Sequence, residues 1–95
     1  MSLRFEWDPK KAKSNLAKHR VSFTEAITVF ADPLARIFND DAHSVDDRRE
    51  IIIGHSAKKN LLLVSFTAHG DLVRVLSARR ATRMERKDYE ENVSS

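Results

Sequence analysis

The chain has 95 residues, a mass of 10.9 kDa, 17 Lys and Arg residues against 14 Asp and Glu residues, and no cysteine. This length is typical of one domain, and we expect residues 1–95 to form one. The lack of cysteine excludes a disulfide scaffold, a thiolate metal site and a Cys nucleophile. No apolar run approaches the roughly 20 residues that cross a bilayer, and no signal-peptide pattern follows the N-terminus, so we expect a cytoplasmic protein without a membrane partner.

The first helix is predicted just after a short strand. Apolar and polar residues alternate at positions 5–7, which favours a strand. Asp8 can then accept a backbone hydrogen bond at the N-cap, and proline suits the first helical position because its missing N–H has no partner there anyway. We therefore expect a helix from Pro9 to about His19, with Ala12 and Leu16 facing inward.

The second helix has the clearest pattern in the chain. Ser22 and Glu25 form a capping box that satisfies two backbone N–H groups. Apolar residues follow at positions 23, 26, 27 and 30, which is the spacing of one helix face. Pro33 disfavours a helical conformation in the residue before it, so this helix should end near Asp32.

Four strands are predicted next. Apolar, often β-branched runs separated by polar or glycine-containing turns indicate strands at 34–38, 49–55, 61–67 and 72–78. The last three are joined by short turns and predict an antiparallel meander. In the final strand, alternation places Val73, Val75 and Ser77 on one face.

A charged C-terminal helix is predicted from a second capping box, Thr82 with Glu85, and should end near residue 92. It has only Met84, Tyr89 and Val93 to bury, so we expect it at the periphery. The element order is then β-α-α-β-β-β-β-α. This order indicates an α+β domain in which two N-terminal helices pack on a twisted antiparallel sheet.

Basic residues gather in two blocks of the sequence. Residues 10–20 and 74–87 carry most of the Lys and Arg, whereas the segment 32–50 is acidic. If folding brings the two basic blocks together, their field attracts polyanions. The alternative is that both blocks are solvated helix faces.

The residue types favour phosphate chemistry over other kinds of catalysis. No His is paired with a second ligand at helical spacing, so we expect no metal site and no cofactor. RNA can be cleaved by its own 2′-OH, provided that the protein moves two protons and neutralises the phosphorane. Imidazole suits the proton transfers, and arginine suits the phosphorane oxygens.

Two candidate residues lie at the end of the first helix. His19 could act as general base or acid, and its neighbour Lys18 could contact the RNA backbone. The alternative is that Lys18, His19 and Arg20 only complement the helix dipole.

Further candidates lie at strand ends and near the N-terminus. Arg48 and Arg79 could stabilise the phosphorane, and Arg83 could position the backbone. For Arg48 the alternative is ion pairing with the acidic residues at 46, 47 and 50. Trp7, the only tryptophan, could stack on a base, although packing against the first helix is the favoured interpretation.

Several motifs resemble the BrnT toxin family, in the family's order, across residues 5–91. The matching segments are Phe5–Asp8, Lys10–Asn15, Lys18–Phe23, Asp47-Arg48, Ile53-Gly54, Val75–Thr82, Glu85-Arg86 and Tyr89-Glu90. Two positions depart from the pattern: Arg20 stands where many relatives have Gly, and Asp47 stands where Glu is usual. Neither change removes a functional group.

This resemblance implies a toxin of a type II toxin–antitoxin system with a RelE-like fold, which cleaves RNA without a metal ion and blocks translation. It also implies a BrnA-like ribbon-helix-helix antitoxin, which forms a hetero-oligomer with the toxin and alone contacts operator DNA. The family's functional positions fall on Lys18, His19, Arg48 and Arg79.

Two other functions would use the same basic blocks. A non-catalytic module would bind RNA or DNA without forming products, and a regulatory protein would use its basic surface only to receive an antitoxin segment. The ribonuclease interpretation depends on one geometric prediction, which is that His19 and Arg79 share a single hollow.

Overall fold

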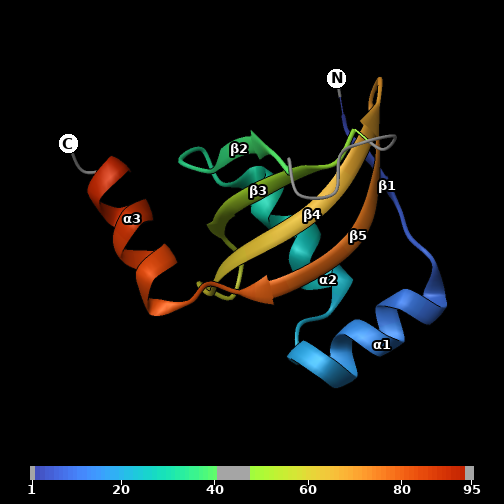
Figure 1. Cartoon of the computed structure of the whole chain (residues 1–95). Helices are drawn as coiled ribbons and strands as arrows, with labels where there is room; N and C mark the ends of the chain where they lie inside the picture. Colours follow the sequence, from blue (N-terminus) through green and yellow to red (C-terminus); the bar gives the residue numbers. More distant parts are fainter. Residues whose placement is uncertain (1, 41–47, 94–95) are drawn as a thin grey trace.

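The computed structural model describes residues 2–40 and 48–93, which form a five-stranded sheet and three α-helices (Figure 1). In chain order the elements are β1 (Arg4–Glu6), α1 (Pro9–His19), α2 (Phe23–Ile27), the 3₁₀ helix η1 (Thr28–Ala31), β2 (Arg36–Asn39), β3 (Glu50–His55), β4 (Leu61–His69), β5 (Leu72–Arg80) and α3 (Arg83–Val93). The predicted α+β class is confirmed. No helix in the described part of the chain is long and apolar enough to span a membrane.

The sheet is mixed, with strand order β1-β5-β4-β3-β2. All neighbouring strands are antiparallel except β1, which runs parallel to β5. Two ion pairs join this edge, Arg4 to Asp71 at 3.2 Å and Arg74 to Glu6 at 2.8 Å. The expectation of a wholly antiparallel sheet is wrong here, because alternation reports which face of a strand is buried and not the direction of its neighbour.

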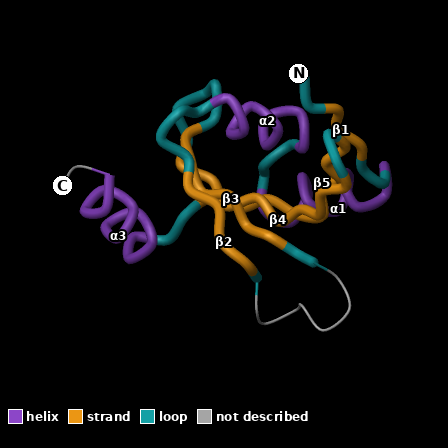
Figure 2. The backbone as a smooth tube through the Cα atoms, turned by 90° about the horizontal axis from the view of Figure 1, so that it is seen from above, coloured by secondary structure: helices purple, strands orange, loops and turns teal. Residues whose placement is uncertain are grey.

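One face of the sheet is covered by helices and the other is largely open. Helix α2 lies behind the strands in Figure 1 and on one side of them in Figure 2, and α1 packs against α2 and β5. The main core lies between these layers and consists of Val21, Phe23, Ala26, Val29, Ile52, Leu62, Val64, Phe66, Val73, Val75 and Ala78. A second cluster on the open side consists of Ile53, Leu61, Leu63 and Tyr89, the last from α3.

Helix α1 has the predicted bounds but a different inner face. Asp8 caps it, accepting a hydrogen bond from the backbone N–H of Lys10 at 2.9 Å. The expectation that Leu16 faces inward is wrong, because Leu16 is 50% exposed and the neighbouring Asn15 is 7% exposed. The helix is rotated so that the Asn15 amide, rather than an apolar side chain, meets the backbone of β5.

The other two helices also differ from their apolar patterns. Helix α2 ends at Ile27 and tightens into η1, where the Thr28 hydroxyl donates to the carbonyl of Glu25 at 2.6 Å. In α3, Tyr89 is buried but Met84 is 67% exposed, so the expected burial of Met84 is wrong. Among the described side chains of α3, Tyr89 is the one that joins a hydrophobic cluster on the sheet.

A β-bulge changes which face the end of β5 presents. Residues 65 and 66 of β4 pair with residues 77 and 75 of β5, so Leu76 is an extra residue. Beyond it Ala78, which is 1% exposed, takes the core face. The prediction that Ser77 shares a face with Val75 is therefore wrong, and Ser77 and Arg79 point to the open face instead.

Candidate functional site

A small hollow of about 70 Å³ lies on the open face, where the end of α1 meets the central strands. It is lined by His19, Ile51, Leu63, Ser65, Ser77, Ala78 and Arg79. His19 and Arg79, which are 60 residues apart in the sequence, therefore lie at one hollow as predicted. The bulge at Leu76 is the reason that Arg79 points there, because unbroken alternation would have sent it to the core face.

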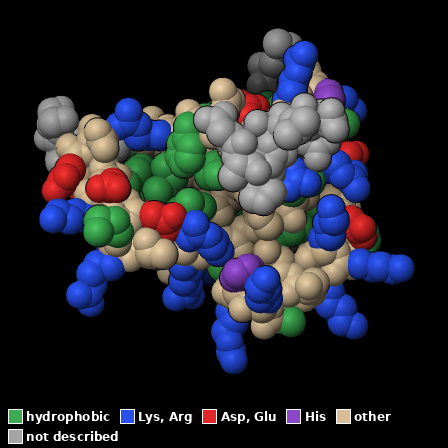
Figure 3. Space-filling model, viewed as in Figure 1, with side chains coloured by type: hydrophobic (Ala, Val, Ile, Leu, Met, Phe, Trp, Pro, Cys, Tyr) green, Lys and Arg blue, Asp and Glu red, His purple; other side chains and the backbone are tan. Residues whose placement is uncertain are grey.

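A second hollow of about 200 Å³ continues from the first around His19. The residues that line it are Lys11, Ser14, Asn15, Lys18, His19, Leu76 and Ser77. His19 and Ser77 belong to both hollows, so the two form a continuous depression with cationic side chains on each side. Figure 3 shows Lys and Arg side chains around the rim of this face of the molecule.

The buried side chain of Asn15 joins α1 to β5 beside the hollow. Its Nδ2 donates to the carbonyl oxygens of Ala78 at 2.8 Å and Val21 at 2.9 Å, and its Oδ1 accepts from the N–H of Ala78 at 3.0 Å. Strand β1 pairs with β5 only through residues 72–74, so the amide takes the place of a neighbouring strand at Ala78. Because Asn15 lies one turn before His19, these bonds fix His19 relative to Arg79.

The guanidinium of Arg79 is held by the first turn of α3. Its Nη1 and Nη2 donate to the two carboxylate oxygens of Glu85 at 2.8 and 2.9 Å. The hydrogen bond from Arg79 holds the pKa of Glu85 at about 2, below its ordinary value of 4.5, so this carboxylate stays charged near neutral pH. Glu85 also completes the predicted capping box with Thr82.

The other predicted site residues lie outside the hollow that His19 and Arg79 share. Arg48 is exposed and directly follows the segment that is not described, so its predicted partners Asp46 and Asp47 fall outside the described residues. Arg83 is exposed at the start of α3. Lys18 lines only the second hollow.

Trp7 lies in a different place from the predicted catalytic residues. Its ring packs edge-on against Phe23, with 5.9 Å between ring centroids, and it lines a separate hollow with Leu16. The main core includes Trp7 among the side chains packed against it, which confirms a packing role, although the ring–ring contact is with Phe23 of α2 rather than with the first helix.

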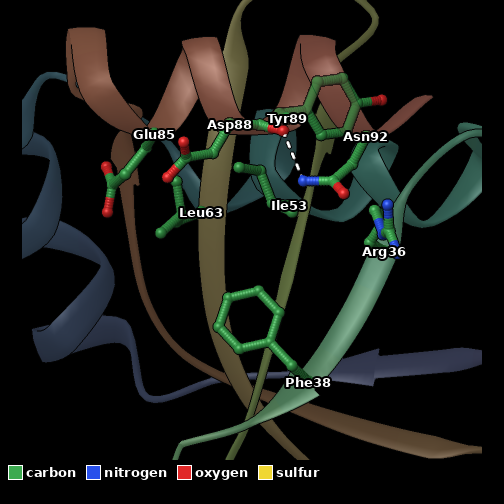
Figure 4. Close-up of a pocket in the computed structure, with 8 residues that line it drawn as sticks. All are labelled: Arg36, Phe38, Ile53, Leu63, Glu85, Asp88, Tyr89 and Asn92. Carbon is green, nitrogen blue, oxygen red and sulfur yellow. Dashed lines mark hydrogen bonds between the residues drawn. The ribbon is translucent and has the colours of Figure 1, made fainter. Parts of the chain in front are cut away.

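An apolar depression near the site lies between α3 and the sheet (Figure 4), with a volume of about 260 Å³. Phe38, Ile53 and Leu63 form its floor, and Asp88 and Asn92 lie above them on α3. Leu63 also lines the hollow with His19, so the two depressions adjoin.

Chemically, the hollow brings together an imidazole, a guanidinium and two hydroxyl groups. The imidazole can accept or donate a proton, and the guanidinium can bind an anionic phosphate. Two contributors were not predicted from the sequence: Asn15, which occupies an inward position of α1, and Glu85, which was recognised only as a capping residue. No group of three or more potential metal-ligating side chains occurs within residues 2–40 and 48–93.

Comparison with known proteins identifies the family. Residues 7–85 match the family model described as the ribonuclease toxin BrnT of type II toxin–antitoxin systems. The crystal structure of the Brucella abortus ribonuclease toxin BrnT is similar, with a TM-score of 0.67 and 25% sequence identity over 86% of this chain and 100% of that one. Comparison with curated protein sequences gives no match. The chain therefore belongs to the BrnT family of ribonuclease toxins of type II toxin–antitoxin systems.

Proposed function

We propose that this protein is a metal-independent endoribonuclease that cleaves RNA by attack of a ribose 2′-OH on the adjacent phosphodiester and thereby inhibits translation. The observation that supports the reaction site is the hollow lined by both His19 and Arg79. In this reaction the O2′–P bond forms and the P–O5′ bond breaks, leaving a 2′,3′-cyclic phosphate and a 5′-OH. The protein must accept the 2′-OH proton, donate a proton to O5′ and neutralise the phosphorane.

His19 is the general base or the general acid in this proposal, and Arg79 stabilises the phosphorane. Lys18, at the adjoining hollow, and Arg83, at the start of α3, hold the flanking RNA backbone. Arg48 does not line the hollow, so we assign it a neighbouring phosphate rather than the reacting one. The packing of Trp7 against Phe23 leaves it no role in this mechanism.

Cleavage of RNA in EDTA tests the proposal. We expect wild-type protein to produce 2′,3′-cyclic phosphate ends, and the Arg79→Ala protein to react roughly 10²–10³-fold more slowly because it lacks the donor to the phosphorane. Arg86→Ala removes the same charge from an exposed position of α3 and should react like wild type. Full activity of Arg79→Ala would remove Arg79 from the mechanism, and a wild-type protein inactive in EDTA would require a metal.

The antitoxin partner is proposed to be a BrnA-like ribbon-helix-helix protein that binds operator DNA for the pair. Membership of a type II toxin–antitoxin family supports the existence of an antitoxin. Expression of this chain alone should arrest growth, and co-expression of the adjacent small reading frame should restore it. Normal growth with the chain alone would favour the non-catalytic, regulatory function.

A further inference from the structure

The hydrogen bonds of Arg79 leave one edge of its guanidinium open. An arginine has five N–H donors, arranged as an end-on pair of Nη groups and a side-on pair of Nε and one Nη. In this structure Glu85 takes one N–H from each Nη, and a second Nη1 proton goes to the carbonyl of Arg80 at 3.3 Å. Among the described residues, the Nε–H and one Nη2–H of Arg79 have no partner.

This open pair has the geometry that phosphate requires. Nε–H and the outer Nη2–H are parallel donors, and such a pair binds two oxygens of one carboxylate or phosphate group. Arg79 lines the hollow with His19, so a phosphate bound to this edge lies within the site that contains the imidazole.

We propose that Glu85 is a positioning residue of the site: it binds the end-on edge of Arg79 and so holds the side-on edge ready for the scissile phosphate. This inference rests on the proposed ribonuclease function. Without the carboxylate, the long Arg79 side chain, which is 42% exposed, would sample other rotamers and engage the phosphate in the reactive geometry for less of the time.

Capping of α3 does not account for the whole arrangement. The cap uses Oε1 of Glu85, which accepts the backbone N–H of Thr82 at 2.8 Å, whereas Oε2 accepts from Arg79 at 2.9 Å. A glutamine serves equally well in a capping box. The second carboxylate oxygen and its charge are therefore available to orient the arginine.

The variant Glu85→Gln separates the two roles, because it preserves the cap acceptor and removes the charged, two-pronged contact with Arg79. We expect kcat for RNA cleavage to fall at least tenfold, while KM stays the same or decreases because a negative charge beside the phosphate has been lost. Glu91→Gln makes the same change at an exposed position of α3 and should leave both constants unchanged. Thermal unfolding of each variant measures whether its folded fraction accounts for any loss.

A double-mutant cycle tests whether Glu85 acts through Arg79. In the Arg79→Ala background, Glu85→Gln should change kcat less than twofold, because the residue it positions is already missing. Equal tenfold losses in both backgrounds would overturn the proposal. A Glu85→Gln protein that cleaves as fast as wild type or faster would overturn it as well, and would make Glu85 a competitor of the phosphate.

A binding measurement distinguishes failure of this inference from failure of the proposed ribonuclease function. The Nε–H resonance of Arg79 can be followed by NMR while a 2′-deoxy oligonucleotide, which cannot be cleaved, is added. We expect this resonance to shift on binding in wild type and to shift less in Glu85→Gln. If wild type does not cleave RNA but the resonance shifts in this way, the positioning role stands and the ribonuclease proposal fails. If the oligonucleotide binds without moving the resonance, the positioning role fails whatever the activity.

Discussion

Arg20 ends helix α1 in a backbone conformation that disfavours its side chain. Its φ is 58° and its ψ 29°, in the left-handed region, and its N–H donates to the carbonyl of Leu16 at 2.9 Å. Glycine is the usual residue here because it lacks the Cβ that crowds the backbone in this conformation. The cation next to His19 is therefore retained at a cost in stability.

The variant Arg20→Gly should be more stable than wild type. We expect the free energy of unfolding to rise by about 1 kcal/mol, as the strain at this position is relieved. Urea unfolding measures this change. Arg4→Gly removes the same side chain from a strand residue with negative φ, so it should lower the free energy of unfolding. An equal change in the free energy of unfolding for the two variants would contradict the role of strain at Arg20.

The buried side chain of Asn15 makes three hydrogen bonds to backbone groups. It hydrogen-bonds the backbone of β5 from the buried face of α1, and its removal leaves the N–H and carbonyl of Ala78 buried without these partners. Asn15→Ala should therefore lower the free energy of unfolding by about 2–4 kcal/mol. Ser14→Ala, at the neighbouring exposed position, should change it by less than about 0.5 kcal/mol. Similar values for both variants would show that the Asn15 bonds contribute little.

Among the elements, α3 is attached to the sheet by few contacts. Tyr89 buries its ring on the open side and donates its hydroxyl to the carbonyl of Leu34 at 3.2 Å, while Glu85, one turn earlier in the helix, pairs with Arg79. Because α3 has two main attachments to the sheet, loss of either one should make its local detachment from the sheet much easier. The Glu85 contact can be removed by acid.

Acid should weaken the attachment of α3 in a defined pH range. Because the pKa of Glu85 falls from 4.5 when unfolded to about 2 when folded, its contribution to stability is complete above about pH 5 and is lost as the pH falls toward 2. Solvent screening of the half-exposed Arg79 reduces this contribution to about 1–2 kcal/mol. Wild type should thus be more stable than Glu85→Gln at pH 5.5, and the difference should nearly vanish at pH 2.

Comparing the two proteins is necessary because other carboxylates titrate in the same range. Burial by itself would raise the pKa of Asp32. Hydrogen bonds from the backbone N–H groups of His55 and Leu34 have the larger combined effect, so the pKa lies below its ordinary value. That shift is common to both proteins and cancels in the difference. A stability difference that is independent of pH would contradict the role of the Glu85 charge.

The elements themselves were largely predictable, and the exceptions have physical causes. The Asp8 N-cap with Pro9 located α1, and capping boxes located the starts of α2 and α3, because these signals act within a few residues. The direction of β1, the bulge at Leu76 and the inward turn of Asn15 depend on residues distant in the sequence. Local patterns contain no information about such partners.

At the scale of the whole molecule, the candidate site exists because α1, β5 and α3 come together on the open face of the sheet. The sequence supplied the residue types and the expectation that His19 and Arg79 meet. The sequence did not show which contacts bring the two residues together. The bulge turns Arg79 of β5 to the open face, Asn15 hydrogen-bonds α1 to β5, and Glu85 of α3 binds Arg79. Arg48, which also matches the family motif, precedes β3 and does not line the hollow, whereas Ile51 within β3 does.

The central claim is that His19 and Arg79 act on the same phosphodiester, and a kinetic double-mutant cycle tests it most directly. Single-turnover rates of RNA cleavage would be compared for wild type, His19→Ala, Arg79→Ala and the double variant, all in EDTA. Residues that act as one unit are strongly non-additive. If both residues act on one phosphodiester, the rate of the double variant should lie within about threefold of the rate of the slower single variant. Losses that multiply fully, or a His19→Ala protein as fast as wild type, would contradict it.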